Sequence, residues 1–258
     1  MRHERGTTRV VAPMRTSSDH PTLAARDPLA APRLDLAGFI EPIVDLRSGA
    51  TVAVEVLLRP RSVPSLARWR RSVGPEARAE VLPLALELAS AELEAGDVLV
   101  HVNATAADLE HPAFAARVLR AVPGAGRHRL VIELTEELPV RDRAAVLAAT
   151  GRLREEGVRF ALDDFGEGWS NFAAVQALRP EILKVTTAIV GPAHDPDLGP
   201  VVARFAREVG AASVIEQVED EATATWARQV GFDLGQGWRW TRAGRRAGVR
   251  AAAGPLSR

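Results

Sequence analysis

Short apolar runs alternate with longer amphipathic stretches along most of this chain. Runs of about four to eight residues rich in Val, Ile and Leu are typical of strands, whereas apolar residues three and four positions apart are typical of helices. The predicted strands are Phe39–Leu46, Val52–Arg59, Val98–Asn103, Leu130–Thr135, Arg159–Phe165, Ile182–Thr186, Ser213–Val218 and Phe232–Leu234. The predicted helices include Pro75–Ala95, Pro112–Ala121, Asp142–Glu156, Leu198–Val209 and Asp220–Val230. Several of these helices begin at Asp or Pro and stop at Gly.

The regular alternation of strands and helices predicts how the elements pack. Strands that are apolar on both faces are typical of parallel sheets covered by helices, and their repetition favours a closed barrel over an open sheet. The first two strands are joined by residues 47–50, a connection short enough for a hairpin. We therefore predict an α/β fold, a TIM-like (β/α)8 barrel in which one strand is antiparallel.

The two ends of the chain lack this pattern. Residues 1–35 carry scattered Arg, His, Ser, Thr and Pro with no apolar period, which predicts a flexible N-terminal arm. Residues 241–258 are mostly Arg, Gly and Ala, which predicts a basic C-terminal tail. The folded domain is expected over residues 36–240, and a second enzymatic domain has no room.

Composition narrows the classes of function. The 258 residues include 33 basic and 33 acidic side chains, and this neutral balance argues against a general nucleic-acid binder. Without cysteine the chain has neither a disulfide framework nor a thiolate metal site. No apolar run approaches the roughly 18 to 20 residues of a membrane span, so we expect a cytoplasmic protein without membrane contact. The six histidines are scattered and are expected to be structural or solvated.

Polar residues recur at the ends of the predicted strands. Each lies in or just after an apolar run, and the set is Glu55, Asn103, Glu133, Asp163, Asp164, Lys184, Glu216 and Gln236. In a barrel these positions converge on one mouth, where barrel enzymes build their active sites. So many carboxylates would repel one another unless a cation neutralised them. Carboxylate and amide oxygens suit Mg²⁺ or Mn²⁺, and such ions beside a lone Lys are typical of phosphoryl hydrolysis.

Seven short segments of the chain resemble, in order, the motifs of EAL-domain cyclic-di-GMP phosphodiesterases. The segments are Glu55–Arg59, Val102–Asn103, Ile132–Glu136, Asp163–Gly166, Leu183–Val185, Glu216–Glu219 and Gln236–Trp238. A tripeptide such as Glu-x-Leu occurs by chance in most proteins, but seven segments in the family's order do not. The resemblance implies hydrolysis of cyclic di-GMP to linear 5′-pGpG by a metal-activated water, with Mg²⁺ or Mn²⁺ as the cofactor.

The resemblance also implies roles for individual residues. Two metal ions would be held by Glu55, Asn103, Glu133, Asp163, Asp164 and Glu219. Lys184 and Glu216 would control the position and the proton of the attacking water. Arg59 would pair with a substrate phosphate, although a salt bridge explains it almost as well, and Gln236 would hydrogen-bond at the metal-water or substrate edge. Glu136 would brace the glycine-rich loop at residues 163–170, which lies beside a dimer surface in the family.

One of these roles has support from composition. Of the 33 basic residues 32 are Arg, and the single Lys, Lys184, stands at the position of the family's lysine. A compact ammonium serves as a point charge near phosphorus, which the broad guanidinium does poorly. The composition therefore favours a functional role for Lys184.

The chain also departs from the family pattern. Thr186 stands where the family's Lys-x-Asp motif supplies a carboxylate. Loss of that carboxylate would weaken metal binding or misplace the water. Gln217 replaces a glycine, and the segment Pro60–Glu76 is shorter than usual. These departures leave an alternative open: a catalytically inactive EAL-type domain that acts as a cyclic-di-GMP receptor or a protein-interaction module. A nucleic-acid regulator acting through the basic tail is a third hypothesis, which the neutral net charge does not support, and a homodimer stays open.

Overall fold

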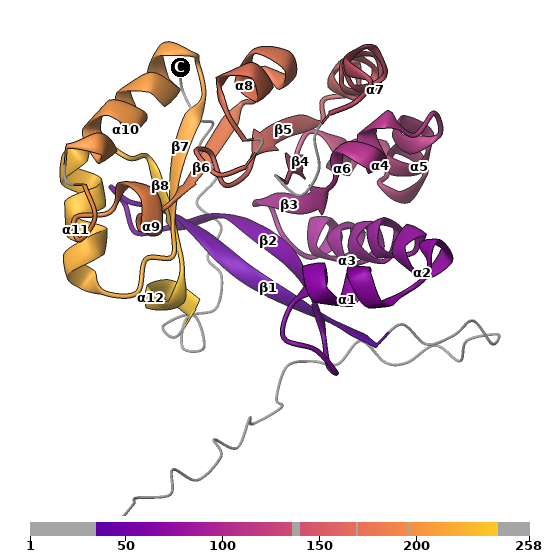
Figure 1. Cartoon of the computed structure of the whole chain (residues 1–258), viewed down its shortest axis with the longest axis horizontal. Coiled ribbons are helices and arrows are strands. Elements are labelled where there is room, and N and C mark those ends of the chain that lie inside the picture. The colour runs from indigo at the N-terminus through magenta and orange to yellow at the C-terminus, as the bar shows by residue number, and fades with distance from the viewer. Residues whose placement is uncertain (1–34, 136–139, 169, 196, 242–258) are drawn as a thin grey trace, which may run out of the picture. The chain divides into compact units, whose positions relative to one another are not determined.

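Eight strands pair side by side in chain order and close into a barrel (Figure 1). The computed structural model describes residues 35–135, 140–168, 170–195 and 197–241. The strands are β1 (Leu36–Asp45), β2 (Thr51–Pro60), β3 (Leu99–Ala104), β4 (Leu130–Leu134), β5 (Arg159–Leu162), β6 (Ile182–Thr186), β7 (Ala212–Glu216) and β8 (Leu234–Gln236). The helices are α1 (Leu66–Ser72), α2 (Pro75–Ala79), α3 (Val81–Ala95), α4 (Ala106–Glu110), α5 (Phe114–Ala121), α6 (Gly124–Arg127), α7 (Arg143–Glu155), α8 (Phe172–Leu178), α9 (Thr187–Val190), α10 (Leu198–Glu208), α11 (Glu221–Val230) and α12 (Trp238–Thr241).

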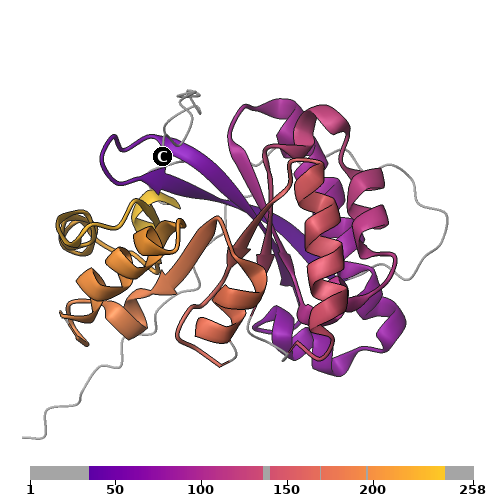
Figure 2. The same ribbon diagram turned by 90° about the horizontal axis from the view of Figure 1, so that it is seen from above.

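The directions of the strands confirm the predicted fold. Strand β1 is antiparallel to both of its neighbours, β2 and β8, whereas every other neighbouring pair is parallel. Helices from the two halves of the chain flank the strands on opposite sides (Figure 2). The chain is therefore a TIM-like barrel with one antiparallel strand. The predicted arm and tail lie outside the described residues, apart from residues 35 and 241.

The hairpin that reverses β1 depends on a local hydrogen-bond network. The Oδ1 atom of Asp45 accepts hydrogen bonds from the backbone N–H groups of Arg47 at 3.0 Å and Ser48 at 2.6 Å. Gly49 follows at φ 73°, a left-handed conformation that glycine adopts without steric cost. The turn therefore directs β2 back along β1, as the short connection predicted.

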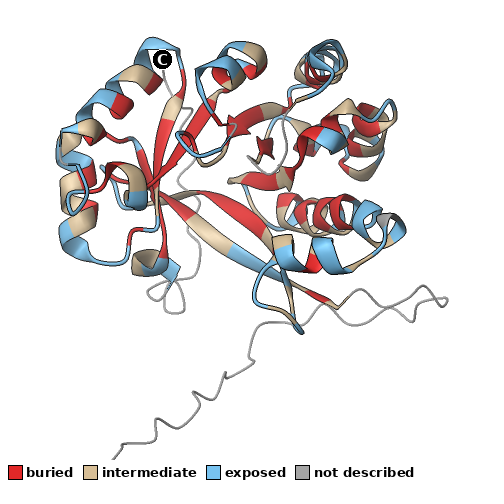
Figure 3. Cartoon of the chain, viewed as in Figure 1, coloured by how far each residue is buried: buried red, intermediate tan, exposed pale blue. Residues whose placement is uncertain are grey.

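The inward faces of the strands form two layers that place the site. One layer is apolar and fully buried, with one residue from each of seven strands: Ile43, Ala53, Val131, Ala161, Ile182, Val214 and Leu234. On β2 and on β4 to β8, a polar residue follows two positions later and so points to the same side of the strand. The apolar layer thereby forms the floor beneath the polar mouth. Figure 3 shows the strands other than β1 largely buried and the outer faces of the helices exposed; the middle of β1 is exposed.

One predicted helix is interrupted. The apolar pattern predicted a single helix over Pro75–Ala95, but the structure divides it at Glu80 into α2 and α3. Pro83 explains the break, because proline lacks an N–H and its ring clashes with the carbonyl four residues earlier, that of Ala79. The prediction of one continuous helix was therefore wrong.

Other helices begin and end at the residues that their sequences predict. Asp142 caps α7 by accepting a hydrogen bond from Ala145 N–H at 2.9 Å, and Asp220 caps α11 through Thr223 N–H at 2.8 Å. Gly231 ends α11 at φ 99°.

No helix among the described residues is long and apolar enough to cross a membrane.

Gln217, directly after β7, has a left-handed backbone at φ 58°. This conformation brings the Cβ atom of an L-residue close to the following carbonyl oxygen, so glycine is favoured there. The glycine expected from the family resemblance thus has a steric reason, and Gln217 carries backbone strain next to Glu216.

Replacing Gln217 by glycine should stabilise the protein. We expect Gln217→Gly to raise the free energy of unfolding by about 0.5 to 1 kcal/mol, since relief of the left-handed strain exceeds the extra entropy of glycine in the unfolded chain. Urea denaturation followed by circular dichroism measures the change. Gln217→Ala is the control, because it removes the side chain but keeps Cβ; an equal gain in both variants would mean that backbone strain is not the cause.

Candidate active site

The polar residues predicted from the strand ends meet at the mouth of the barrel. Glu55 lies on β2, Asn103 on β3, Glu133 on β4, Lys184 on β6, Glu216 on β7 and Gln236 on β8, with Asp163 and Asp164 directly after β5. They converge because the strands β2 to β8 run in the same direction and end at the same rim. The structure therefore brings together eight residues from seven strands.

Lys184 is at the centre of this group. Its side chain is fully buried, and its Nζ atom lies 2.8 Å from Glu133 Oε2, 2.9 Å from Glu216 Oε1, 3.1 Å from Asp163 Oδ1 and 3.2 Å from Glu55 Oε2. One ammonium thus contacts four carboxylates. With all five groups ionised, three negative charges remain in excess.

Glu55 connects the lysine to two amides. Its Oε1 atom accepts a hydrogen bond from Asn103 Nδ2 at 2.6 Å, and its Oε2 atom accepts one from Gln236 Nε2 at 2.6 Å. Each amide group donates its N–H to Glu55, which leaves its carbonyl oxygen free to accept. The orientation of Asn103 and Gln236 is therefore set by Glu55.

The pKa values at the mouth follow from burial and crowding. Burial, reinforced by the other carboxylates, raises the pKa of both Glu133 and Glu216 well above the ordinary value. Burial would also raise the pKa of Glu55, but the Lys184 ammonium and the two amide hydrogen bonds outweigh it and lower that pKa. Burial disfavours the charged lysine, yet the four carboxylates raise the pKa of Lys184 well above its usual range. Lys184 is consequently cationic, and the raised pKa values of Glu133 and Glu216 reflect the crowding of carboxylates at the mouth.

The residues at the mouth fit a divalent cation. Asp163, Asp164 and Glu216 each offer a carboxylate oxygen within 4.8 Å of those of the other two. The carbonyl oxygens Asn103 Oδ1 and Gln236 Oε1 are buried, and no described residue donates a hydrogen bond to them. Carboxylate and amide oxygens are the ligands that Mg²⁺ and Mn²⁺ prefer. A cation would both satisfy unpaired acceptors and offset the excess negative charge.

Arg59 lies on β2, on the same face as Glu55 and four residues further along the strand. Its guanidinium carbon lies 5.4 Å from the ring centroid of Phe39, in a cation–π contact. No ion pair with Arg59 occurs within the described part of the chain. The described residues therefore do not support a salt bridge as the role of Arg59. Its guanidinium is exposed and can bind an anion.

The roles predicted for Glu219 and Glu136 are not supported by an observed contact. Glu219 is exposed in the connection after β7 and does not belong to the carboxylates that lie within 4.8 Å of one another. Glu136 falls in residues 136–139, outside the described residues. Their proposed roles stay predictions.

Sequence reasoning assigned no role to Glu41, at the mouth, or to His101, in the layer directly beneath it. Glu41 on β1 pairs in register with Glu55, and burial and the charge of Glu55 raise the pKa of Glu41. His101 is fully buried on β3, and its Nδ1 atom lies 2.5 Å from Glu133 Oε1. The sequence held a signal for each of them. His101 stands two residues before Asn103 and so on the same face of the strand, and reversal of the first strand brings Glu41 to the mouth. His111, His128 and His194 are exposed.

Thr186 ends β6 on the same face as Lys184, two positions further toward the rim. It is 1% exposed, and its buried hydroxyl oxygen has no hydrogen-bond partner in the segments that the structure describes. In register it stands beside Glu216 of β7. The residue in place of the family's Asp therefore lies at the mouth and offers a neutral oxygen.

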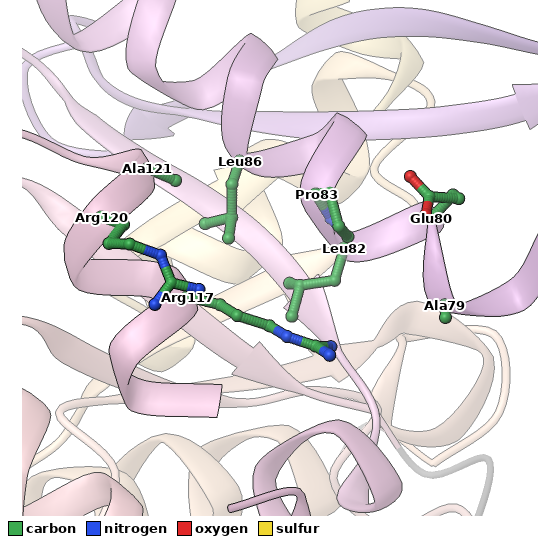
Figure 4. A pocket seen from close by; sticks show the side chains of 8 residues that line it. All are labelled: Ala79, Glu80, Leu82, Pro83, Leu86, Arg117, Arg120 and Ala121. Carbon is green, nitrogen blue, oxygen red and sulfur yellow. The ribbon is translucent and has the colours of Figure 1, made fainter. Parts of the chain in front are cut away.

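A separate pocket of about 440 Å³ lies away from the mouth, between α3 and α5 (Figure 4). Leu82, Pro83 and Leu86 line it, with the Arg117 and Arg120 side chains extending along one side. No residue predicted to be functional lines this pocket. The candidate site is accordingly the barrel mouth.

Comparisons with known proteins agree with the geometry. The sequence matches the EAL domain over residues 35–243. A cyclic di-GMP phosphodiesterase of Pseudomonas aeruginosa is 28% identical over 223 residues, which cover 77% of this chain and 36% of that protein. The chain thus spans little more than a third of that relative's length.

Solved structures support the same fold. An EAL domain protein of Listeria monocytogenes has a TM-score of 0.71 at 18% identity, with 81% of this chain and 88% of that chain covered. BlrP1 of Klebsiella pneumoniae, in complex with manganese and cyclic di-GMP, has a TM-score of 0.69 at 23% identity, with 82% and 57% covered. The family match includes all eight strands and every residue of the mouth. This chain belongs to the EAL domain family.

Proposed function

We propose that the chain is a metal-dependent phosphodiesterase that hydrolyses one phosphodiester bond of cyclic di-GMP and releases linear 5′-pGpG. The observation that carries the proposal is the buried Lys184 ammonium among four carboxylates at the barrel mouth. A phosphodiester is an anion that needs positive charge on its oxygens and a positioned water. The related P. aeruginosa enzyme and the bound cyclic di-GMP of BlrP1 support this choice of substrate.

Two groups of residues would hold the metal ions. Asp163, Asp164 and Glu216 form the acidic group whose oxygens lie close together, and Glu55, Asn103 and Glu133 line the adjoining part of the mouth. Glu219 would complete the acidic set only if its exposed side chain turned inward. When bound, Mg²⁺ or Mn²⁺ would lower the pKa of a water molecule and neutralise charge on the phosphate.

The protein's own residues would then direct the reaction. Lys184 would hold the attacking water, and Glu216, 2.9 Å from the lysine, would take its proton. The water oxygen would bond to phosphorus, the bond from phosphorus to the ribose O3′ would break, and the 5′-phosphate would stay on the product. The departing O3′ would take up a proton, which Glu216 would return, and become the 3′-hydroxyl of pGpG. Arg59 would pair with the second phosphate through its guanidinium, and Gln236 would hydrogen-bond at the substrate edge.

A second candidate function is a cyclic-di-GMP receptor or a protein-interaction module without catalysis. It is favoured by Thr186, which puts a neutral hydroxyl where the family has a carboxylate at the mouth. One negative charge fewer would weaken the binding of divalent ions. The cytoplasmic location stays a prediction under both functions.

Hydrolysis is the direct test. Purified protein with cyclic di-GMP and Mg²⁺ or Mn²⁺ should release pGpG, detected by liquid chromatography. Asp164→Asn should lower kcat by about a hundredfold or more, since a direct ligand matters at least as much as the residues around it. Asp97→Asn is the control, because Asp97 is exposed and precedes β3 at the end opposite the mouth. Saturable binding without product would favour the receptor, and turnover that survives Glu55→Ala would indicate a contaminating enzyme.

Thr186 determines how strongly the mouth binds metal. We expect Thr186→Asp to raise the affinity for Mn²⁺ about tenfold or more, because it adds a charged ligand beside Glu216. Titration calorimetry measures the affinity, and the metal dependence of turnover provides a second reading. Thr186→Asn is the matched control, since it adds an oxygen of similar reach without the charge. An equal effect of both variants would show that charge is not what Thr186 lacks.

The homodimer left open by the sequence has a candidate surface. Phe172 of α8 is 68% exposed and Val201 of α10 is 50% exposed, and the rings of Phe172 and Phe205 lie 5.0 Å apart. Phe165, from the loop after Asp164, contacts both rings, so this apolar surface adjoins the mouth. We propose that a second copy of the chain covers it.

Light scattering should test this assembly. The protein should be a dimer in solution, and Phe172→Ser should make it monomeric because it removes the most exposed apolar side chain of the surface. Leu147→Ser is the control, since Leu147 is a similarly exposed apolar residue on α7, at 47%. A monomeric wild-type protein, or a dimer unaffected by Phe172→Ser, would contradict the proposal.

A further inference from the structure

His101 interrupts the apolar floor of the barrel. On β2 and on β4 to β8, the residue two positions before the polar mouth residue is apolar and fully buried. On β3 the corresponding residue, two positions before Asn103, is His101, which is also 0% exposed. In register it stands beside Glu55 on β2 and Val131 on β4. A polar ring is thus buried at a place where six other strands use an aliphatic or alanine side chain.

Among the described residues the ring has one hydrogen-bond partner, and that partner belongs to the site. His101 Nδ1 lies 2.5 Å from Oε1 of Glu133, whose other oxygen, Oε2, accepts from Lys184 Nζ at 2.8 Å. His101 Nε2 is buried and has no hydrogen-bond partner within the described part of the chain. Because Glu133 offers a carboxylate oxygen, the ring donates to it only in the tautomer that carries its N–H on Nδ1. A histidine kept for packing alone would not need this arrangement.

We propose that His101 is a positioning residue of the site: its Nδ1–H holds Glu133 so that the opposite carboxylate oxygen faces Lys184 and the mouth. Glu133 is fully buried, and the hydrogen bond from the ring satisfies the oxygen that points away from Lys184. An apolar residue at position 101 would leave that oxygen unpaired and free the carboxylate to rotate. Residues that orient a metal ligand alter the affinity of the site for the metal. An effect of His101 on a bound cation therefore rests on the proposed function, in which Glu133 is a metal ligand.

Two substitutions separate positioning from packing. In His101→Asn the amide nitrogen takes the place of Nδ1 and can donate to Glu133, whereas in His101→Leu a methyl group takes that place. The two side chains are similar in size, so both remove the same part of the ring, and the variants differ in the donor. Circular dichroism and thermal unfolding establish that each variant is folded before it is compared.

Manganese affinity is the main readout. We expect His101→Leu to weaken Mn²⁺ binding by about 10- to 100-fold in calorimetric titration, and His101→Asn to restore most of that loss. Equal losses in the two variants would assign His101 to packing, and an unchanged affinity in His101→Leu would overturn the proposal. Absence of Mn²⁺ binding by the wild-type protein would also overturn it, whereas Mn²⁺ binding without pGpG production would contradict only the catalytic function.

A spectroscopic signature tests the hydrogen bond itself without metal or substrate. Long-range ¹H–¹⁵N spectra of the metal-free protein should show His101 as the neutral tautomer protonated on Nδ1. The Nε2-protonated tautomer, which cannot donate to Glu133 from Nδ1, would contradict the proposed role.

Discussion

The site depends on one buried interaction, the contact of the Lys184 ammonium with four carboxylates. Neither side of this contact is stable alone in the interior: a buried ammonium without partners, or carboxylates without a cation, loses its hydration without compensation. Removing one partner of a buried ion pair costs about 3 to 5 kcal/mol in typical proteins. The four carboxylates come from β2, β4, the end of β5 and β7, so the lysine also joins the strands of the barrel at their ends.

The barrel produces this arrangement through the two-residue repeat of its strands. An apolar residue fills the interior, and the next residue on the same face is polar and reaches the mouth, as with Val131 and Glu133 or Ile182 and Lys184. The closed sheet brings these ends together and keeps water away from the layer beneath. The stability of the fold and the chemistry of the site therefore come from successive residues on the same face of the same strands.

Departures from this repeat are where the chain acquires its individual character. His101 replaces an apolar floor residue with a hydrogen-bond donor, and Thr186 replaces a rim carboxylate with a neutral hydroxyl. Gln217 holds a left-handed backbone directly beside Glu216. All three lie within or next to the mouth, and strained or polar exceptions of this kind are expected where function rather than stability selects the residue.

The sequence by itself determined the barrel, its antiparallel first strand and the polar residues at the rim, from Glu55 on β2 to Gln236 on β8. The signals were local ones: the apolar period of each element, the short connection between the first two strands and the polar residue at each strand end. It also singled out Lys184. Only the tertiary structure decided which groups touch: the four partners of Lys184, the contact of His101 with Glu133 and the place of Glu41 beside Glu55. Those contacts depend on the stagger between strands far apart in sequence, which no local pattern encodes. The break at Glu80 had a local cause in Pro83, but the apolar period of α3 continued through it and concealed the break.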